Sequence, residues 1–96
     1  MSEVLKALAH PTRRDILQML KAREMSAGEI ASRFDLTKPT LSGHFNVLRE
    51  AGLVDVQRKG TTLIYRLNAS VLEEALMALM DGFGFGRAAS DKDEQP

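Results

Sequence analysis

The spacing of apolar residues changes abruptly near residue 53, and this change restricts the chain to few folds. Before it, apolar residues recur at intervals of three and four, which is typical of helices packed on a core. From residue 54 to residue 67 they recur at every second position, which is typical of strands. The chain is therefore expected to be mainly α-helical with one small β-hairpin.

Four helices are expected before the hairpin, because residues suited to helix starts recur along this part of the chain: Ser2, Pro11, Ser26 and Thr37. Ser26 and Glu29 have the spacing of a capping box. Residues 35–36 form a tight break, and Pro39 fits the first turn of the fourth helix. Gly52 supplies a left-handed stop after it.

The hairpin and one more helix complete the expected order, α-α-α-α-β-β-α. Residues 58–61 form the hairpin tip, where Gly60 is free to take a positive φ. Asn68 or Ser70 caps a final helix over residues 71–80, which is apolar around most of its girth. This is the order of a winged helix-turn-helix domain.

Length and composition fit a single domain. Ninety-six residues are too few for two domains, so residues 1–82 are assigned to the winged helix-turn-helix domain and residues 83–96 to a flexible, glycine-containing acidic tail. The chain has no cysteine, which excludes disulfides and thiolate metal ligands. No apolar run approaches the ~20 residues of a membrane helix. The N-terminus lacks a secretory pattern, so a cytoplasmic protein is expected.

The net charge is zero, but the charges are unevenly distributed. Residues 1–70 hold 11 Lys and Arg against 7 Asp and Glu, whereas residues 71–96 hold 2 against 6. This pattern fits a protein that binds nucleic acid through its basic residues 1–70 and uses its acidic residues 71–96 for a different surface. Chance would also produce such an asymmetry, so it carries little weight alone.

The fourth helix carries the strongest functional signal. If Leu41, Phe45 and Leu48 face the core, the outward set consists of small or hydrogen-bonding residues: Thr37, Lys38, Pro39, Thr40, Ser42, Gly43, His44 and Asn46. Small side chains let a helix enter the major groove, and polar ones meet base edges there. Gly43 costs helix stability, which close approach of DNA would explain. The alternative is a poorly optimised surface helix.

Two other segments are candidates for contacts with the DNA backbone. The first is the hairpin tip, which would reach phosphates or the minor groove: Arg58, Lys59, Gly60 and Thr61. The second is the start of the second helix, where Thr12 and Arg13 would bind phosphate. Equally, Arg13 or Arg14 would form structural ion pairs with an acidic residue, namely Asp15, Glu24 or Glu50.

The final helix is more apolar than expected for the surface of a monomer. Together with the first helix it predicts a two-fold dimer interface: Val4, Leu5, Leu8, Leu72, Leu76, Leu79 and Met80. Two copies would place two fourth helices about one DNA turn, ~34 Å, apart and read an inverted-repeat operator. The alternative is that residues 71–80 cap the core of the monomer.

Three stretches resemble the ArsR/SmtB family of winged-helix repressors: LAHPTRRDIL at residues 8–17, AGEIA at residues 27–31 and LSGHFNVLREAGLV at residues 41–54. Lys38 to His44 is similar to the metal-independent SdpR-type autorepressor subgroup in particular. The resemblance implies a homodimer that binds an operator in double-stranded DNA through helix 37–51 and wing 54–67 and represses transcription. It also implies either that a protein partner relieves repression or that the protein simply regulates its own expression. These residues do not identify the partner.

Many members of this family release DNA on binding a metal, and this sequence departs from them. The third helix lacks their cysteine motif, and the final helix holds Glu73 and Glu74 but no histidine. The only histidines, His10 and His44, are expected to lie too far apart to share an ion. Because zinc-type ions favour His and Cys ligands, no metal and no cofactor is expected.

Two other classes of function would need residues that this sequence lacks. A protein-interaction module would favour acidic residues on the outward face of the fourth helix, which has none before Glu50. An enzyme would need an acid–base pair, a Ser-His-Asp set or a phosphate-binding glycine loop, and none is visible. The glycines of residues 82–86 lack a following helix, so they are not a nucleotide signature. The chain is not expected to be an enzyme.

Overall fold

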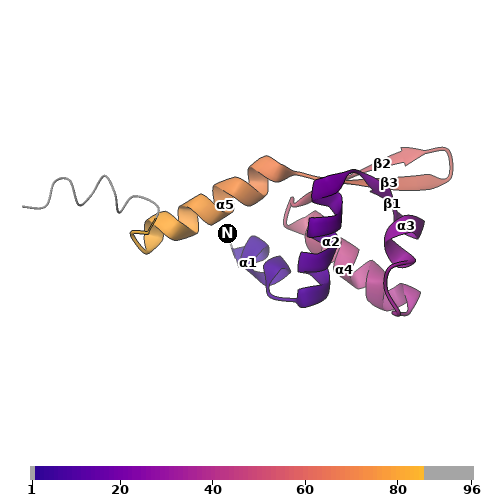
Figure 1. The fold of residues 1–96 in the computed structure, drawn as a ribbon, viewed down its shortest axis with the longest axis horizontal. Coiled ribbons are helices and arrows are strands. Elements are labelled where there is room, and N and C mark those ends of the chain that lie inside the picture. The colour runs from indigo at the N-terminus through magenta and orange to yellow at the C-terminus, as the bar shows by residue number, and fades with distance from the viewer. Residues whose placement is uncertain (1, 86–96) are drawn as a thin grey trace, which may run out of the picture.

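The computed structural model of the chain describes residues 2–85, and it contains a helical body, a β-hairpin and a projecting last helix (Figure 1). The elements follow the chain in this order: α1 (Ser2–Leu8), α2 (Pro11–Ala22), β1 (Met25–Ser26), α3 (Ala27–Ala31), α4 (Lys38–Glu50), β2 (Val54–Lys59), β3 (Thr62–Leu67) and α5 (Ala69–Gly82). The predicted order is confirmed with one addition, the short strand β1. Ser2 lies within α1 rather than before it.

The three strands form one antiparallel sheet in the order β1-β3-β2. The β2–β3 hairpin pairs Val54 with Leu67 at its base and Lys59 with Thr62 at its tip. Strand β1 adds two residues to the other edge, where Met25 pairs with Tyr65. Two residues are too short to show a period in the sequence, which explains why β1 was not predicted.

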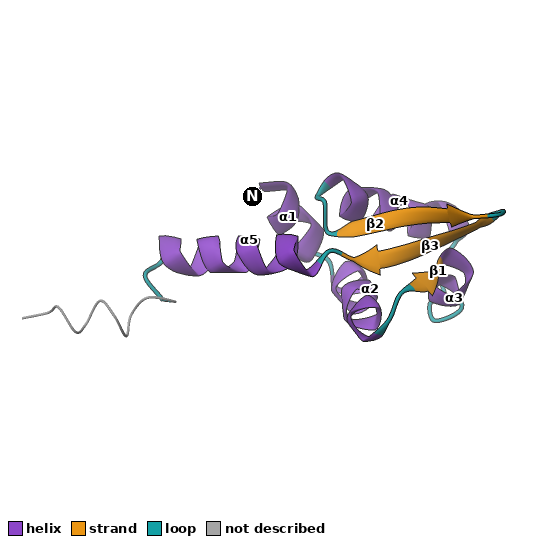
Figure 2. Cartoon of the chain, turned by 90° about the horizontal axis from the view of Figure 1, so that it is seen from above, coloured by secondary structure: helices purple, strands orange, loops and turns teal. Residues whose placement is uncertain are grey.

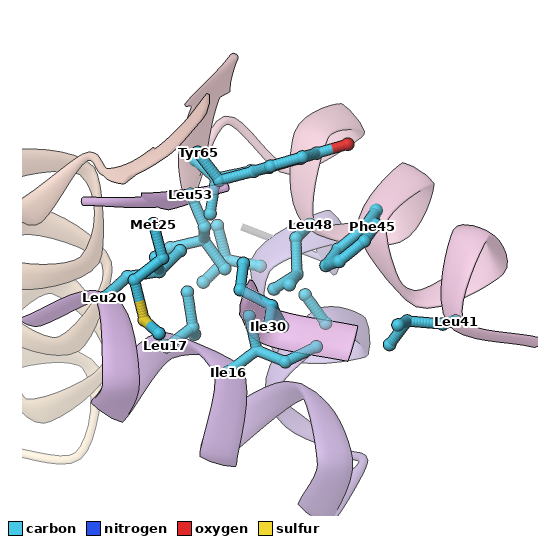
Figure 3. Close-up of a cluster of buried hydrophobic side chains, with 13 residues drawn as sticks. Ile16, Leu17, Leu20, Met25, Ile30, Leu41, Phe45, Leu48, Leu53 and Tyr65 are labelled. Carbon is cyan, nitrogen blue, oxygen red and sulfur yellow. The ribbon is translucent and has the colours of Figure 1, made fainter. Parts of the chain in front are cut away.

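The core lies where α1, α2, α3 and α4 meet the base of the sheet (Figure 3). Its fully buried large side chains come from four different segments: Ile16, Ile30, Leu48 and Leu53. Leu41, Phe45 and Leu48 of α4 are all buried, so the predicted inward face of this helix is confirmed.

Local hydrogen bonds explain why the helices begin and end where they do. Ser26 Oγ accepts from the Glu29 N–H at 3.0 Å while Glu29 Oε1 accepts from the Ser26 N–H at 2.9 Å, which completes the predicted capping box. Gly52 takes φ 76° at the end of α4. The Leu53 N–H then donates to the Leu48 carbonyl at 3.0 Å. This Schellman turn reverses the chain from α4 into β2.

Helix α5 leaves the body on the side remote from the hairpin (Figures 1 and 2). None of its residues is buried, and only its first half, including Leu72 and Ala75, packs against the core. Leu76, Met77 and Met80 are 41%, 63% and 44% exposed. Most of α5 therefore does not cap the core of the monomer, which was the alternative interpretation.

The predicted dimer-interface residues do not all lie on the surface. Val4 is only 7% exposed and belongs to the core of the monomer, so its assignment to a dimer interface is wrong. Short helix α1 turns Val4 and Ala7 inward, which leaves Leu5 on its outer side at 40% exposed. Leu8, Leu72 and Leu79 are half-buried.

Beyond α5, Phe83 to Phe85 form a hydrogen-bonded turn. The Phe85 N–H donates to the Met80 carbonyl at 2.8 Å, and Gly84 takes φ 78°. Residues 86–96, which make up most of the predicted acidic tail, lie outside the described residues. Within residues 2–85, no helix has the length and apolar character needed to cross a membrane.

Candidate nucleic-acid interface

The reading surface predicted on α4 is exposed except at one residue. Seven of its eight predicted members are exposed: Thr37, Lys38, Pro39, Thr40, Ser42, Gly43 and Asn46. Their contact with DNA stays a prediction. The arrangement gives a helix whose inner side is held by large apolar residues and whose outer side, from Thr37 to Asn46, carries small or hydrogen-bonding residues.

The cap of α4 leaves one hydroxyl proton available to a ligand. Thr37 Oγ1 accepts from the Thr40 N–H at 3.3 Å and donates its own proton to Thr40 Oγ1 at 2.9 Å. Thr40 therefore accepts within the chain, and its hydroxyl hydrogen is free to donate outward. One hydroxyl hydrogen of this pair is thus left to donate to a ligand at the N-terminal end of the helix.

Gly43 has no structural reason within the described chain to be glycine. It lies in mid-helix without a positive φ, and a Cβ built there would meet nothing within 4 Å. Glycine in an exposed helix costs about 1 kcal/mol relative to alanine. The open space over Gly43 is thus compatible with close approach of a second molecule.

His44 does not belong to the outer face, and the prediction that it points outward is wrong. It is 9% exposed, and its Nδ1 lies 3.0 Å from Arg13 Nη1. Burial, followed by the nearby His10 and Arg13, lowers the pKa of His44 below its usual 6.5. Its spacing from Leu41 and Leu48, three and four residues, already matched the inner face, but its polar type suggested the outer one.

His10 and His44 also lie closer together than predicted. Their ring centroids are 4.5 Å apart, because the turn between α1 and α2 places His10 directly against α4. The expectation that the fold separates them is therefore wrong. No group of three or more His, Asp or Glu suited to a metal ion occurs among residues 2–85, and the absence of a metal remains a prediction.

Arg13 is not available for phosphate, which corrects its predicted role. Its Nε donates to the Ala7 carbonyl at 2.8 Å and its Nη2 to the Lys6 carbonyl at 2.9 Å. Arg14 similarly donates to the Leu8 carbonyl at 2.7 Å. The alternative of ion pairs with acidic residues is also wrong, because both arginines bind carbonyls at the end of α1. Thr12 beside them is half-buried.

The hairpin tip is the second exposed polar feature. Arg58, Lys59, Gly60 and Thr61 are all exposed, and Gly60 takes φ 64° in the turn. Of the ion pairs found in residues 2–85, Arg23–Glu29 and Arg66–Asp55, neither uses a cation of the tip. The tip lies at the end of the molecule remote from α5 (Figure 2). Its two cations are therefore available to an anionic partner.

Sequence comparison identifies related regulators. A helix-turn-helix domain family matches residues 8–57. The chain is 43% identical over 76 residues to the transcriptional repressor SdpR of Bacillus subtilis, a match that covers 79% of this chain and 84% of that protein. It is 44% identical over 79 residues to the biofilm growth-associated repressor of Agrobacterium fabrum, covering 79% and 68% of the two chains.

Solved structures agree with these relatives. HlyU from Vibrio cholerae superposes with a TM-score of 0.70 at 35% identity, over 83% of this chain and 87% of that one. An ArsR-like transcriptional regulator from Rhodococcus superposes with a TM-score of 0.75 at 26% identity, over 97% and 89%.

An exposed polar helix, the short helix before it and a basic hairpin wing together define a winged helix-turn-helix regulator that binds DNA. The chain belongs to the ArsR family of these regulators, as its sequence motifs predicted. Membership in a family of transcriptional regulators agrees with the expectation that it is not an enzyme.

Proposed function

We propose that this protein is a metal-independent repressor or autorepressor that binds a palindromic operator as a homodimer. The observation that carries the proposal is the outer face of α4, where every exposed residue from Thr37 to Asn46 is small or able to hydrogen-bond. Two relatives named as repressors support the direction of regulation. The site holds no residues that call for a cofactor.

In this proposal α4 enters the major groove. Thr40 and Ser42 offer hydroxyl groups to base edges, and Lys38 reaches guanine acceptors or phosphate. Gly43 allows the helix to approach closely, since its position is open. Asn46 extends the polar face by one turn.

The wing supplies contacts that do not depend on sequence. Arg58 and Lys59 lie at the tip of the hairpin and would bind phosphates or enter the minor groove beside α4. Gly60 and Thr61 form the turn itself and would approach the backbone closely. Thr12, half-buried at the start of α2, is kept as a candidate phosphate contact.

The dimer is proposed to form through the exposed apolar faces of α1 and α5. Leu5, Leu76 and Met80 are each at least 40% exposed, which is unfavourable for large apolar side chains in water. Half-buried Leu8, Leu72 and Leu79 would complete the surface. A two-fold axis between such faces would present two copies of α4 to one side of a duplex, ~34 Å apart.

We further propose that the protein acts in the cytoplasm and that no metal relieves repression: either a protein partner relieves it, or the protein simply regulates its own expression. The chain has no cysteine. The chain therefore cannot supply the cysteine thiolates that bind the metal in many metal sensors.

The test is binding of the protein to its own promoter fragment, measured by fluorescence anisotropy over a series of salt concentrations. Lys59→Ala is expected to weaken binding to all sequences and to reduce the salt slope by about 2, because the dimer loses about 1 for each protomer. Ser42→Ala is expected to reduce the preference for the operator over an unrelated duplex. Lys21→Ala, an exposed lysine of α2 outside the proposed interface, serves as the matched control. Indifference to every duplex would contradict the proposal.

A further inference from the structure

One guanidinium group joins three helices of the body. Arg13 of α2 donates from Nε and Nη2 to the carbonyls of Ala7 and Lys6 at the end of α1. Its remaining Nη1 lies 3.0 Å from Nδ1 of His44 on α4. The position of α4 relative to the end of α1 is therefore set in part by a single hydrogen-bonded link, Lys6/Ala7–Arg13–His44.

The chemistry of the link fixes the state of the histidine. Arg13 carries only donors and stays charged at all relevant pH values, so His44 Nδ1 must be the acceptor. Nδ1 accepts only when the ring is neutral with its proton on Nε2. A protonated His44 would lose this bond and would place a second cation beside the guanidinium.

We infer that His44 is a positioning residue for DNA binding: its neutral ring, through Arg13, holds α4 in the orientation that reads the operator, and protonation of the ring releases that orientation and weakens binding. This inference rests on the proposed function, because it needs α4 as the helix that contacts DNA. His44 follows Ser42 and Gly43 directly, so a shift of His44 moves the polar face that meets the duplex.

The surroundings of His44 disfavour its charged form. Burial lowers the pKa of His44, and His10 and Arg13 lower it further. The other charged residues of α4 and of the elements packed on it are exposed and are not among the causes of this shift: Glu3 and Lys6 of α1, Arg14, Asp15 and Lys21 of α2, Lys38, Arg49 and Glu50 of α4, and Asp55, Arg58 and Lys59 of β2. Described residues therefore offer no carboxylate to stabilise a protonated His44.

The test compares the wild-type protein with His44→Asn. The asparagine Oδ1 can occupy the place of Nδ1 and accept from Arg13, but it does not titrate. Operator binding is measured by anisotropy from pH 7.5 down to the midpoint of the His44 ring, at constant ionic strength. Both proteins are expected to bind within about twofold at pH 7.5, and the wild type to bind about fourfold more weakly than the variant at that midpoint, because each of the two rings of the dimer is then half protonated.

His10→Asn is the matched control, since asparagine retains the cap acceptor for the Thr12 N–H while removing the other imidazole ring. This variant is expected to keep the acid-induced loss of binding. Equal pH dependence in the wild type and His44→Asn would overturn the inference while leaving the proposed function intact. Failure of all three proteins to bind any duplex at pH 7.5 would instead contradict the proposed function.

A second measurement does not require DNA. In NMR spectra of the whole protein, the backbone amides of Ser42 and Gly43 and those at the end of α1 are expected to titrate with the midpoint of the His44 ring. In His44→Asn these amides are expected to lose that titration. If the amide shifts of Ser42 and Gly43 in the wild type do not change at the pH where His44 titrates, the inference is overturned, whatever the DNA measurements give.

Discussion

The ring of Phe45 on α4 stacks on the ring of Tyr65 on β3, with centroids 4.5 Å apart and an angle of 26° between the planes (Figure 3). Both side chains are buried, at 7% and 5% exposed. Tyr65 belongs to the wing and also pairs with Met25 of β1, so this one residue links the wing to both α4 and β1. The stack therefore fixes the wing to α4, and the two proposed DNA contacts are expected to move as one unit.

Removing this stack should cost much of the stability of the domain. Tyr65→Ala deletes a buried aromatic ring and is expected to lower the free energy of unfolding by about 3–5 kcal/mol. Tyr65→Phe keeps the ring and is expected to change it by less than about 1 kcal/mol. Urea denaturation at fixed protein concentration measures both. A loss in Tyr65→Phe as large as that in Tyr65→Ala would show that the hydroxyl, not the stack, matters.

Gly43 should separate stability from function. Gly43→Ala is expected to stabilise the protein by about 0.5–1 kcal/mol, because the position is helical and a Cβ there meets nothing within 4 Å. The same methyl group should weaken operator binding if α4 lies close to DNA. Gly82→Ala at the end of α5, where a Cβ is also unobstructed, is the control for stabilisation without loss of binding. Unchanged binding in Gly43→Ala would contradict close approach.

The lowered pKa of His44 should make stability depend on pH. The unfolded chain takes up a proton at His44 near pH 6.5, whereas the folded chain takes it up only at a lower pH. The contribution of His44 is therefore complete above about pH 6.5 and is lost as the pH falls towards the folded pKa. Urea denaturation of the wild type and His44→Asn between pH 7.5 and pH 5 should show a steeper fall for the wild type. Parallel curves would contradict the prediction.

The proposed dimer should respond to charge on one face of α5 only. Leu76→Glu is expected to give a monomer, because the carboxylate would be buried without a partner in the interface. Ala78→Glu, on the opposite side of the same helix, should leave the dimer intact. Light scattering after size-exclusion chromatography gives the mass of each variant. A wild type that is already a monomer at micromolar concentration would contradict the dimer.

The sequence predicts what depends on local chemistry. Ser26 and Thr37 correctly predicted where α3 and α4 begin, and Gly52 correctly predicted where α4 ends. The spacing of Leu41, Phe45 and Leu48 correctly predicted the inner face of α4. These features arise from backbone capping and from burial along one helix, and both leave a periodic trace in the sequence.

What the sequence did not predict depends on tertiary contacts. Arg13 and His44 are 31 residues apart, and no local pattern shows that one guanidinium would bind both the end of α1 and a ring on α4. Each was therefore assigned to DNA by its chemical type. Val4 was assigned to an interface because short α1 does not reveal which of its apolar residues faces the core.

Methylation interference on the operator tests the central claim most directly, since it reports which groove α4 occupies. Guanine N7 lies in the major groove and adenine N3 in the minor groove, so methyl groups at the two positions block different surfaces. We predict that N7 methylation at guanines in two half-sites about one turn apart abolishes binding. Full binding to DNA methylated at every N7 within the protected region would contradict the account.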